Sequence, residues 1–332
     1  MRPGLALLVV LSACAARPVG QASPAVLWLG GDVHLGAGDG AALLPVREVT
    51  GGEALVVNLE GPVGDGAAAS TAERLVNGPG AAKALAAAGV RAAQVDNNHA
   101  GDLGVDGRAA TRRALEAAGV LPAGVARFSL GATRVVLVGV DLGPATVHSA
   151  RTSEGAPPAS GTSDTSAPAP FATTAAGWVE GESSDVLERR LRAAKTPEEA
   201  LIVTFHVTGP PSYLPTPELE AAVEAALRAG ATVVAAHGTH AVARVERRGD
   251  AVIAWGLGNL VFDCRCTEEE EGLLLRVELD ASGRVGPALV VPVDAGLHGT
   301  AVRPARDRAL LLRLLESLGS TPLRPAGLGA RL

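Results

Sequence analysis

Val26-Leu27-Trp28-Leu29-Gly30-Gly31-Asp32-Val33-His34 is a short apolar run that ends in two glycines and two possible metal ligands. The run from Val26 to Leu29 has the length and composition of a buried strand. In α/β sheets, binding sites form at the carboxyl ends of the strands. This stretch therefore predicts a buried strand that brings a carboxylate and an imidazole to a site.

Other predicted strands also end directly before polar residues. These are Ala54–Asn58 with Asn58-Leu59-Glu60, Ala92–Asp96 with Asn97-Asn98-His99, Leu201–Phe205 with His206, and Thr232–Ala236 with His237 and His240. Any one of them has an ordinary explanation, since a lone His206 could be an interior histidine and Asn98 could cap a turn. Their repetition at strand ends instead predicts one shared metal site, because carboxylate, amide and imidazole ligands together suit Zn, Mn or Fe.

The order of the predicted elements indicates the fold class. Helical spacing occurs at 81–88, 108–118, 185–194, 218–229 and 306–318. Short turns join the predicted strands 126–130 to 133–140 and 243–247 to 251–256, which predicts two hairpins. Parallel strands early and hairpins later predict a mixed two-sheet α/β domain over residues 24–318. Residues 151–177 are almost entirely small or polar, which predicts a low-complexity loop that interrupts this domain.

The first residues have the features of an export signal. Arg2 precedes the apolar run Leu5–Leu11, which is too short to cross a bilayer. Leu11-Ser12-Ala13-Cys14 resembles the bacterial lipobox, so residues 1–14 are predicted to be a lipoprotein signal peptide with lipidation at Cys14. An ordinary cleaved signal is the alternative. Both interpretations predict an extracytoplasmic protein of the cell envelope, and the first attaches it to the membrane through its N-terminal lipid.

Charge and cysteine content narrow the classes of partner and site. The net charge is −6 and the arginines are scattered among acidic residues, which argues against a nucleic-acid partner. Cys264 and Cys266 are the remaining cysteines, two residues apart on the predicted strand Leu260–Cys266, so their side chains would face the same way. A local disulfide, a metal site and no special role all remain open for this pair.

The motifs in order resemble the calcineurin-like metallophosphoesterase superfamily and, more closely, its CapA family of poly-γ-glutamate capsule-biosynthesis proteins. The resemblance rests on the segments Gly31–Gly36, Val57–Pro62, Asn97–Gly104, His237–His240 and Trp255–Asp263. The most specific of these is Gly256-Leu257-Gly258-Asn259-Leu260-Val261-Phe262, since the superfamily at large lacks it.

This resemblance implies a four-layer α/β/β/α sandwich of the metallophosphoesterase type with two divalent metal ions, which would be Mn, Fe or Zn. By position, one metal would be held by Asp32, His34 and His240. The other would be held by Asn98, His206 and His237, and Glu60 would bridge the two where the superfamily normally uses Asp. His99 would be the catalytic general acid, and Asn58 and Asn259 would be supporting residues.

The chain departs from the family pattern at three places. The family often has a nonligand such as Met where His34 stands, so the Asp-x-His pair is closer to an active phosphoesterase. The superfamily's Gly-His-x-His is replaced by Ala236-His237-Gly238-Thr239-His240, with one more residue between the histidines. After His206, a segment that is usually aromatic and acidic reads Val207-Thr208-Gly209-Pro210-Pro211.

Three functions follow as expectations. The first is an envelope-anchored, binuclear metal-dependent hydrolase that acts on a phosphoester substrate in capsule or poly-γ-glutamate biosynthesis. The second is a noncatalytic accessory protein for assembly or export of an anionic surface polymer. The third is hydrolysis of amide bonds in the polymer itself, because an activated water molecule can attack a carbonyl as well as phosphorus.

Overall fold

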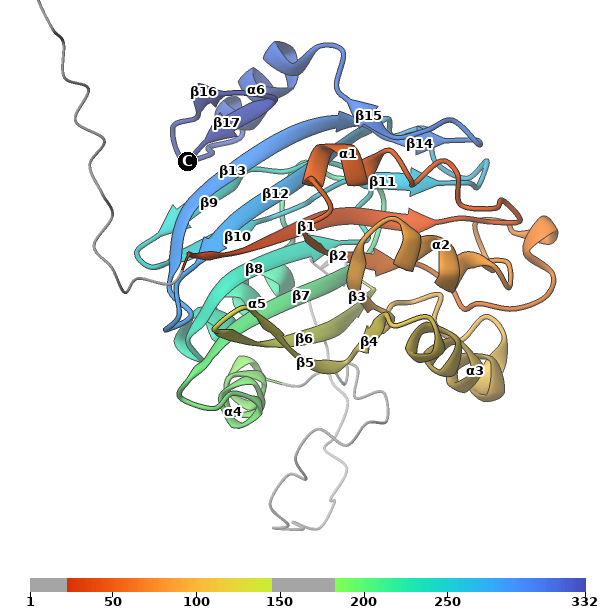
Figure 1. The fold of residues 1–332 in the computed structure, drawn as a ribbon, viewed down its shortest axis with the longest axis horizontal. Coiled ribbons are helices and arrows are strands. Elements are labelled where there is room, and N and C mark those ends of the chain that lie inside the picture. The colour runs from red at the N-terminus through yellow and green to blue at the C-terminus, as the bar shows by residue number, and fades with distance from the viewer. Residues whose placement is uncertain (1–22, 145–182) are drawn as a thin grey trace, which may run out of the picture.

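The computed structural model describes residues 23–144 and 183–332. Within these ranges the strands form two mixed sheets with helices on their outer faces (Figure 1). The predicted signal peptide with Cys14 and the predicted loop at 151–177 lie outside the described residues. None of the helices in the two described ranges is long and apolar enough to cross a membrane.

The larger sheet combines strands from both ends of the chain. Its order is β16 (Arg324–Ala326), β17 (Gly329–Arg331), β13 (Val285–Asp294), β12 (Glu271–Leu279), β1 (Ala25–His34), β2 (Ala54–Leu59), β3 (Val90–Gln94) and β4 (Leu121–Ala123). Three more strands pair at its side: β11 (Asn259–Phe262) with β1, β14 (Gly296–Leu297) with β11, and β15 (Arg303–Pro304) with β13. The smaller sheet has the order β5 (Val125–Leu130), β6 (Thr133–Pro144), β7 (Glu199–Thr208), β8 (Ala231–His237), β10 (Ala251–Ala254) and β9 (Val245–Arg248).

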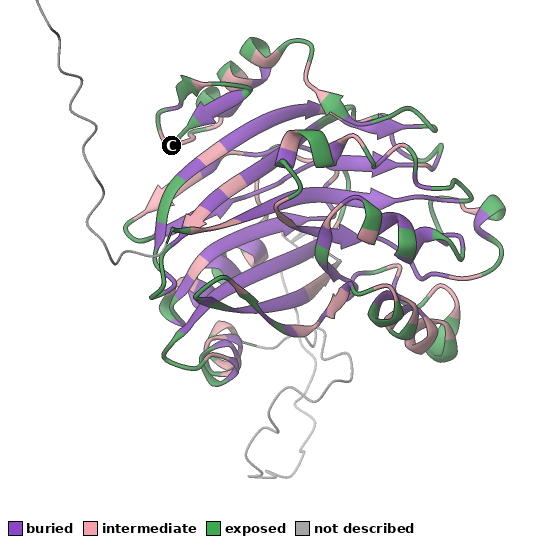
Figure 2. Ribbon diagram, in the orientation of Figure 1, coloured by how far each residue is buried: buried purple, intermediate pink, exposed green. Residues whose placement is uncertain are grey.

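Each sheet buries one face against the other sheet and one face against helices. Between the sheets, Leu29 and Val56 belong to the same core as Leu137 and Ile202. On the outside, α1 (Val46–Thr50), α2 (Ala81–Ala87) and α3 (Gly104–Ala117) cover the larger sheet, and α4 (Ser184–Ala194) and α5 (Pro217–Arg228) cover the smaller one. α6 (Arg308–Ser317) closes one end of the core between the sheets. Figure 2 shows the resulting pattern, with buried strands and exposed outer faces on the helices.

This arrangement confirms the predicted α/β fold with four layers. Both predicted hairpins are present, as β5 with β6 and as β9 with β10. The predicted strand Leu260–Cys266 is wrong at its end, because β11 stops at Phe262. Cys264 and Cys266 form a disulfide, and their Cα atoms are 5.2 Å apart, closer than the roughly 6.6 Å between alternate residues of a strand. The chain therefore turns where the sequence predicts an extended segment.

The strand register brings several predicted site residues side by side. Asp32 in β1 lies level with Asn58 in β2 on one side and with Asn259 in β11 on the other. In the smaller sheet, His206 at the end of β7 is level with His237 at the end of β8. All three pairs are between parallel strands, so these residues share the carboxyl edges of the two sheets. The structure thus confirms that the predicted strand ends meet.

Candidate metal centre

Asp32 lies at the centre of the site, where β1 and β11 approach closely. A Cβ atom on Gly31 would lie 2.0 Å from the carbonyl oxygen of Gly258, so only glycine allows this approach. The Asp32 N–H donates to that same carbonyl at 2.9 Å. The Asp32 side chain is fully buried, and its carboxylate accepts hydrogen bonds from Asn58 Nδ2 at 2.9 Å and from the Gly238 N–H at 3.0 Å. The carboxylate is therefore fixed before any ligand binds.

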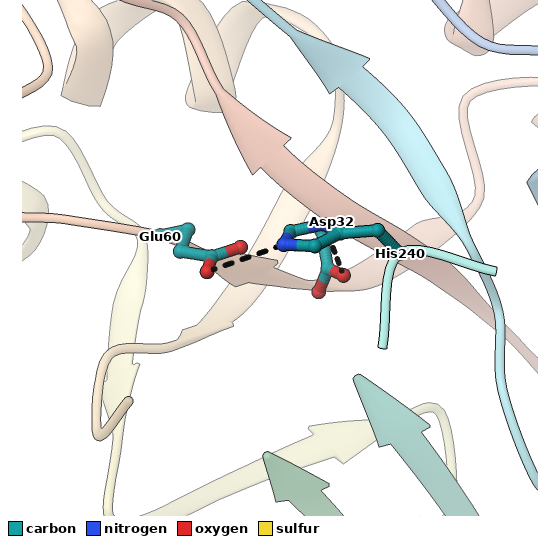
Figure 3. A group of neighbouring side chains, drawn as sticks. All are labelled: Asp32, Glu60 and His240. Atoms are coloured by element: carbon teal, nitrogen blue, oxygen red, sulfur yellow. Dashed lines mark ion pairs between the residues drawn. The ribbon is translucent and has the colours of Figure 1, made fainter. Parts of the chain in front are cut away.

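Asp32, Glu60 and His240 form a group that could hold a metal ion. One ligand atom from each lies within 4.8 Å of the other two. Figure 3 shows the three side chains pointing toward one another from β1, from the end of β2 and from the turn after β8. His240 Nδ1 is 3.4 Å from Asp32 Oδ2, and His240 Nε2 is 3.8 Å from Glu60 Oε1.

The turn after β8 explains how the longer spacing between the two histidines is accommodated. Gly238 has φ of 87° and His240 has φ of 54°, both in the left-handed region. This conformation disfavours a residue with a side chain by roughly 1–2 kcal/mol, so His240 keeps it only because its surroundings hold it there. The extra residue is thus absorbed by a tight turn, and His240 still faces Asp32.

Asn259 fixes which nitrogen of His240 is free to bind a metal. Asn259 Nδ2 donates to the Glu269 carbonyl at 3.1 Å, so its Oδ1 faces His240 Nδ1, 2.9 Å away. Because an amide oxygen only accepts, His240 Nδ1 must carry the hydrogen and Nε2 keeps its lone pair. Hydrogen bonds of this kind orient histidine ligands in metal sites. The arrangement fits the supporting role predicted for Asn259.

His206, Asn98 and His237 surround the same carboxylates. His206 Nε2 lies 2.8 Å from Asn98 Oδ1 and 3.9 Å from Glu60 Oε1. His237 lies on the other side, with Nδ1 3.5 Å from Asp32 Oδ1. Asn58, the other predicted supporting residue, links the two predicted ligand sets. Its Nδ2 contacts Asp32 Oδ1 and lies 3.4 Å from His206 Nδ1.

Of the three residues predicted to hold the first metal, His34 is the one that lies outside the group of Asp32, Glu60 and His240. Its Nε2 lies 3.3 Å from the Val76 carbonyl oxygen, and its ring is tilted against Phe262 with the centroids 5.4 Å apart. His34 is fully buried at the end of β1. The carboxylate and the imidazole of the Asp-x-His motif therefore have different surroundings in this structure.

Buried polar atoms without partners indicate that these side chains suit a cation. Among the described residues, Glu60 Oε2 and both ring nitrogens of His237 are buried and make no hydrogen bond. Buried polar atoms in proteins nearly always have a partner, so each such atom needs an explanation. A divalent cation between the carboxylates and imidazoles would provide one, and the mixed oxygen and nitrogen donors match the preferences of Zn, Mn and Fe. The residues therefore fit the predicted metal.

Burial and mutual proximity shift the acid–base properties of the group. Burial, reinforced by the nearby Asp32 and opposed by His240, raises the pKa of the Glu60 carboxyl to about 8. Burial lowers the pKa of His206 to about 3. For Asp32, burial is outweighed by the contact with His237 and the charge of His240, and its pKa falls below the ordinary range. Two carboxylates this close repel each other when both are ionised, and a bound cation would remove that repulsion.

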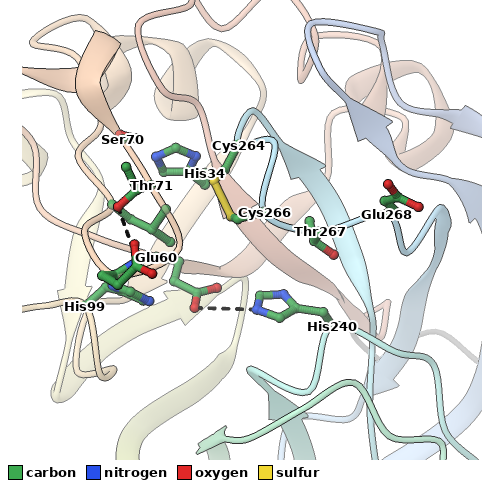
Figure 4. The surroundings of a disulfide bond; sticks show 12 residues. His34, Glu60, Ser70, Thr71, His99, His240, Cys264, Cys266, Thr267 and Glu268 are labelled. Atoms are coloured by element: carbon green, nitrogen blue, oxygen red, sulfur yellow. Dashed lines mark hydrogen bonds and ion pairs between the residues drawn. A yellow bond between two sulfur atoms is a disulfide. The ribbon is translucent and has the colours of Figure 1, made fainter.

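A cavity of about 220 Å³ opens onto this group and is also bordered by the predicted general acid. Its lining includes Glu60, Asn98, His99, His240, Phe262 and Cys266. Cys266 forms a disulfide with Cys264, and Figure 4 shows this disulfide near Glu60, His99 and His240. A substrate in the cavity would therefore touch both the candidate metal ligands and His99.

Several residues that build the site were given no role by the sequence analysis. Asn97 Nδ2 donates to Asn58 Oδ1 at 3.1 Å and to the Leu59 carbonyl at 2.8 Å. Asn77 Nδ2 donates to the carbonyl of Glu60 at 2.8 Å, which holds the backbone of that ligand. Asp102 lies 2.7 Å from His99 Nδ1 and follows it by three residues. Of these three residues, only Asp102 could have been found from the sequence, through its spacing from His99.

Comparison with known families gives one match. The sequence model of a family described as bacterial capsule synthesis protein PGA_cap matches residues 41–264, more than half of the chain. The matched region contains every predicted site residue except Asp32, His34 and Cys14. No curated protein matches the chain.

Proposed function

This chain belongs to the bacterial capsule synthesis protein family PGA_cap, and we propose that it is a metal-dependent hydrolase of the cell envelope that acts on a phosphoester. The observation that carries this proposal is the buried group of Asp32, Glu60 and His240 beside a cavity that His99 also lines. Hydrolysis of a phosphoester needs groups that stabilise negative charge and a group that gives the leaving oxygen a proton. With a cation bound to Asp32, Glu60 and His240, the site would bring both to one cavity.

The residues divide into two roles. Asp32, Glu60 and His240 would hold a divalent cation, with His206, His237 and Asn98 beside them for a second. Divalent cations in such sites polarise a phosphoryl oxygen and activate water as the nucleophile. In the proposed reaction, the water oxygen loses a proton to solvent and forms a new bond to phosphorus while the bond to the leaving oxygen breaks. His99 supplies the proton that the leaving oxygen needs.

We expect hydrolysis in the full-length, detergent-solubilised protein after loading with Mn, Fe or Zn. A screen of phosphomonoesters and phosphodiesters should identify at least one substrate whose cleavage stops on chelation and returns when metal is added back. Metal content should be measured on the same samples. Fully metal-loaded protein that cleaves no phosphoester in the screen would contradict the enzymatic proposal.

One observation favours the accessory function as the alternative. His34 contacts the Val76 carbonyl and does not join the Asp32, Glu60 and His240 group, so this group has fewer ligands than the Asp-x-His pair of an active phosphoesterase would give it. A weakly held cation could still bridge the protein to an anionic surface polymer, although the net charge of −6 makes the rest of the protein a poor receptor for one.

The proposed location is the outer face of a membrane, held by lipid on Cys14. The lipobox-like Leu11-Ser12-Ala13-Cys14 supports this, and two acyl chains are enough for stable attachment. Intact-mass measurement of protein extracted from membranes should show a mature chain that begins at Cys14 and carries a diacyl or triacyl modification. A mature chain without lipid, or one that begins at another residue, would refute the anchoring.

A further inference from the structure

The hairpin of β16 and β17 presents two arginines side by side to solvent. Arg324 and Arg331 lie directly opposite each other in its two strands, and both are exposed. Ala330, next to Arg331, is buried in the core between the sheets, so the arginines point to the outside. Among the described residues, neither arginine has an ion-pair partner. Like charges at opposite positions of a strand pair repel each other, so an anion outside the protein would stabilise this pair.

The tip of the same hairpin is apolar. Ala326 pairs with Gly329, so the turn consists of Gly327 and Leu328, and Gly327 has φ of 55°. Glycine in the first position of a two-residue turn is typical of type II′, and turn positions are usually filled by glycine or by small polar residues. Leu328 instead leaves 46% of its surface exposed. The turn itself therefore does not explain this apolar side chain.

The start of α6 extends the surface of the hairpin. Arg308 Nη1 donates to the Gly327 carbonyl at 3.1 Å, which holds α6 beside the tip. Leu310, two residues further along α6, is 57% exposed. The acidic residue here is Asp307, whose carboxylate accepts the Leu310 N–H at 2.9 Å and caps the helix. Positive charge therefore exceeds negative charge on a surface that we call the hairpin surface and that consists of Arg308, Leu310, Arg324, Leu328 and Arg331.

The described chain begins beside the hairpin surface. Glu278 and Pro287 line one cavity together with Gly327, and they line a second cavity together with Pro24. Figure 1 likewise shows the start of β1 and the β16–β17 hairpin on the same side of the molecule. Pro24 follows Cys14 by ten residues, a length of chain that spans at most roughly 36 Å. A lipid on Cys14 would therefore hold this side of the protein close to a bilayer.

We propose that the hairpin surface rests on the membrane, with its arginines against anionic phospholipid headgroups and its two leucines in the interface below them. This inference rests on the proposed lipid attachment and is independent of the proposed hydrolysis. Exposed apolar side chains combined with arginines are typical of surfaces that bind at a membrane interface. The hairpin surface shares no residue with the group of Asp32, Glu60 and His240, so variants in it leave the candidate metal centre unchanged.

The first test measures binding to vesicles by full-length protein that carries no lipid. The Cys14→Ala variant cannot be lipidated at that residue. It should sediment with vesicles that contain phosphatidylglycerol and much less with vesicles of phosphatidylcholine alone, and high salt should release it because salt screens the charges. The apolar run Leu5–Leu11 is present in every sample, so the difference between the two vesicles is the readout. Equal binding to both would overturn the proposal.

The second test changes the hairpin surface in the same Cys14→Ala protein. Arg324→Glu with Arg331→Glu should weaken binding to the anionic vesicles by at least about 10-fold, because each arginine near such a surface contributes a factor of about five. Arg113→Glu with Arg189→Glu, at exposed positions on α3 and α4, changes the net charge equally and should have little effect. Equal losses in the two double variants would mean that net charge alone controls binding, and would refute the hairpin surface.

A third variant shows whether the tip of the hairpin takes part. Leu328→Ser replaces an exposed turn residue, so the protein should keep its melting temperature and bind the anionic vesicles several-fold more weakly. Analytical ultracentrifugation without vesicles tests a different occupant, a second copy of the chain. A dimer that Leu328→Ser converts to a monomer would assign the surface to self-association and would overturn the membrane proposal.

The surface and the lipid can fail separately. If wild type is lipidated on Cys14 but vesicle binding does not depend on Arg324 and Arg331, the anchoring stands and the hairpin surface is refuted. If binding depends on these arginines but mature wild type carries no lipid, the hairpin surface stands and the proposed anchoring fails.

Discussion

Replacing Glu60 with glutamine should remove the bound metal from the protein. Glu60 Oε1 lies 3.8 Å from His240 Nε2 and 3.9 Å from His206 Nε2, so this carboxylate lies between the two halves of the predicted site. Glutamine keeps the shape of the side chain and removes the charge that binds the cation. Metal analysis should find about one equivalent or more in wild type and only traces in Glu60→Gln.

Two further measurements make the Glu60 result specific. Adding metal should raise the melting temperature of wild type but not of Glu60→Gln, because a ligand stabilises only a protein that binds it.

In the metal-free protein the pKa of Glu60 is raised to about 8, so below that pH a cation must displace a proton. The metal affinity of wild type should therefore increase as the pH rises toward 8. Glu268→Gln, at an exposed position in the loop before β12, is the matched control and should bind metal normally.

Replacing His99 with alanine should abolish most hydrolysis while the metal stays bound. His99 lines the cavity, but it is not one of the three residues that form the candidate metal group. Removal of a general acid typically lowers the rate by a factor of about 10² to 10⁴. We therefore expect kcat to fall by at least about 10² on an alkyl phosphoester, with the metal content of wild type.

The same variant separates the hydrolase from the accessory protein. In a strain that depends on this protein for a surface polymer, His99→Ala should reduce polymer yield if hydrolysis is the function. An accessory protein would keep its yield, because its metal site would be intact. Unchanged polymer yield together with unchanged metal content would therefore refute the catalytic role of His99.

Much of the fold and site could be predicted because the signals are local. Asp32, Glu60 and His206 each follow an apolar run, and parallel strands place their carboxyl ends at the same edge. The short turns at Gly131 and Gly249 likewise predicted two hairpins that the structure contains.

The parts that could not be predicted depend on contacts between distant segments. His34 is held by the carbonyl of Val76, which is 42 residues away. Asn77, next to Val76, holds that loop by donating to the carbonyls of Glu60 and Gly61. The sequence pattern around His34 does not predict where the loop with Val76 and Asn77 lies. The pairing of Cys264 with Cys266 could not be predicted for a similar reason. The disulfide requires the chain to turn after Phe262, and β11 ends there where its pairing with β1 ends.

The central claim is that Asp32, Glu60 and His240 hold a divalent cation, and anomalous diffraction from crystals of zinc-loaded protein tests it most directly. Data collected on both sides of the zinc edge should show a peak about 2.0–2.2 Å from a carboxylate oxygen of Asp32, from a carboxylate oxygen of Glu60 and from Nε2 of His240. The peak should be absent from crystals of Glu60→Gln grown under the same conditions. A fully loaded protein whose only zinc peaks lie elsewhere, such as at the exposed Glu268, would contradict the account.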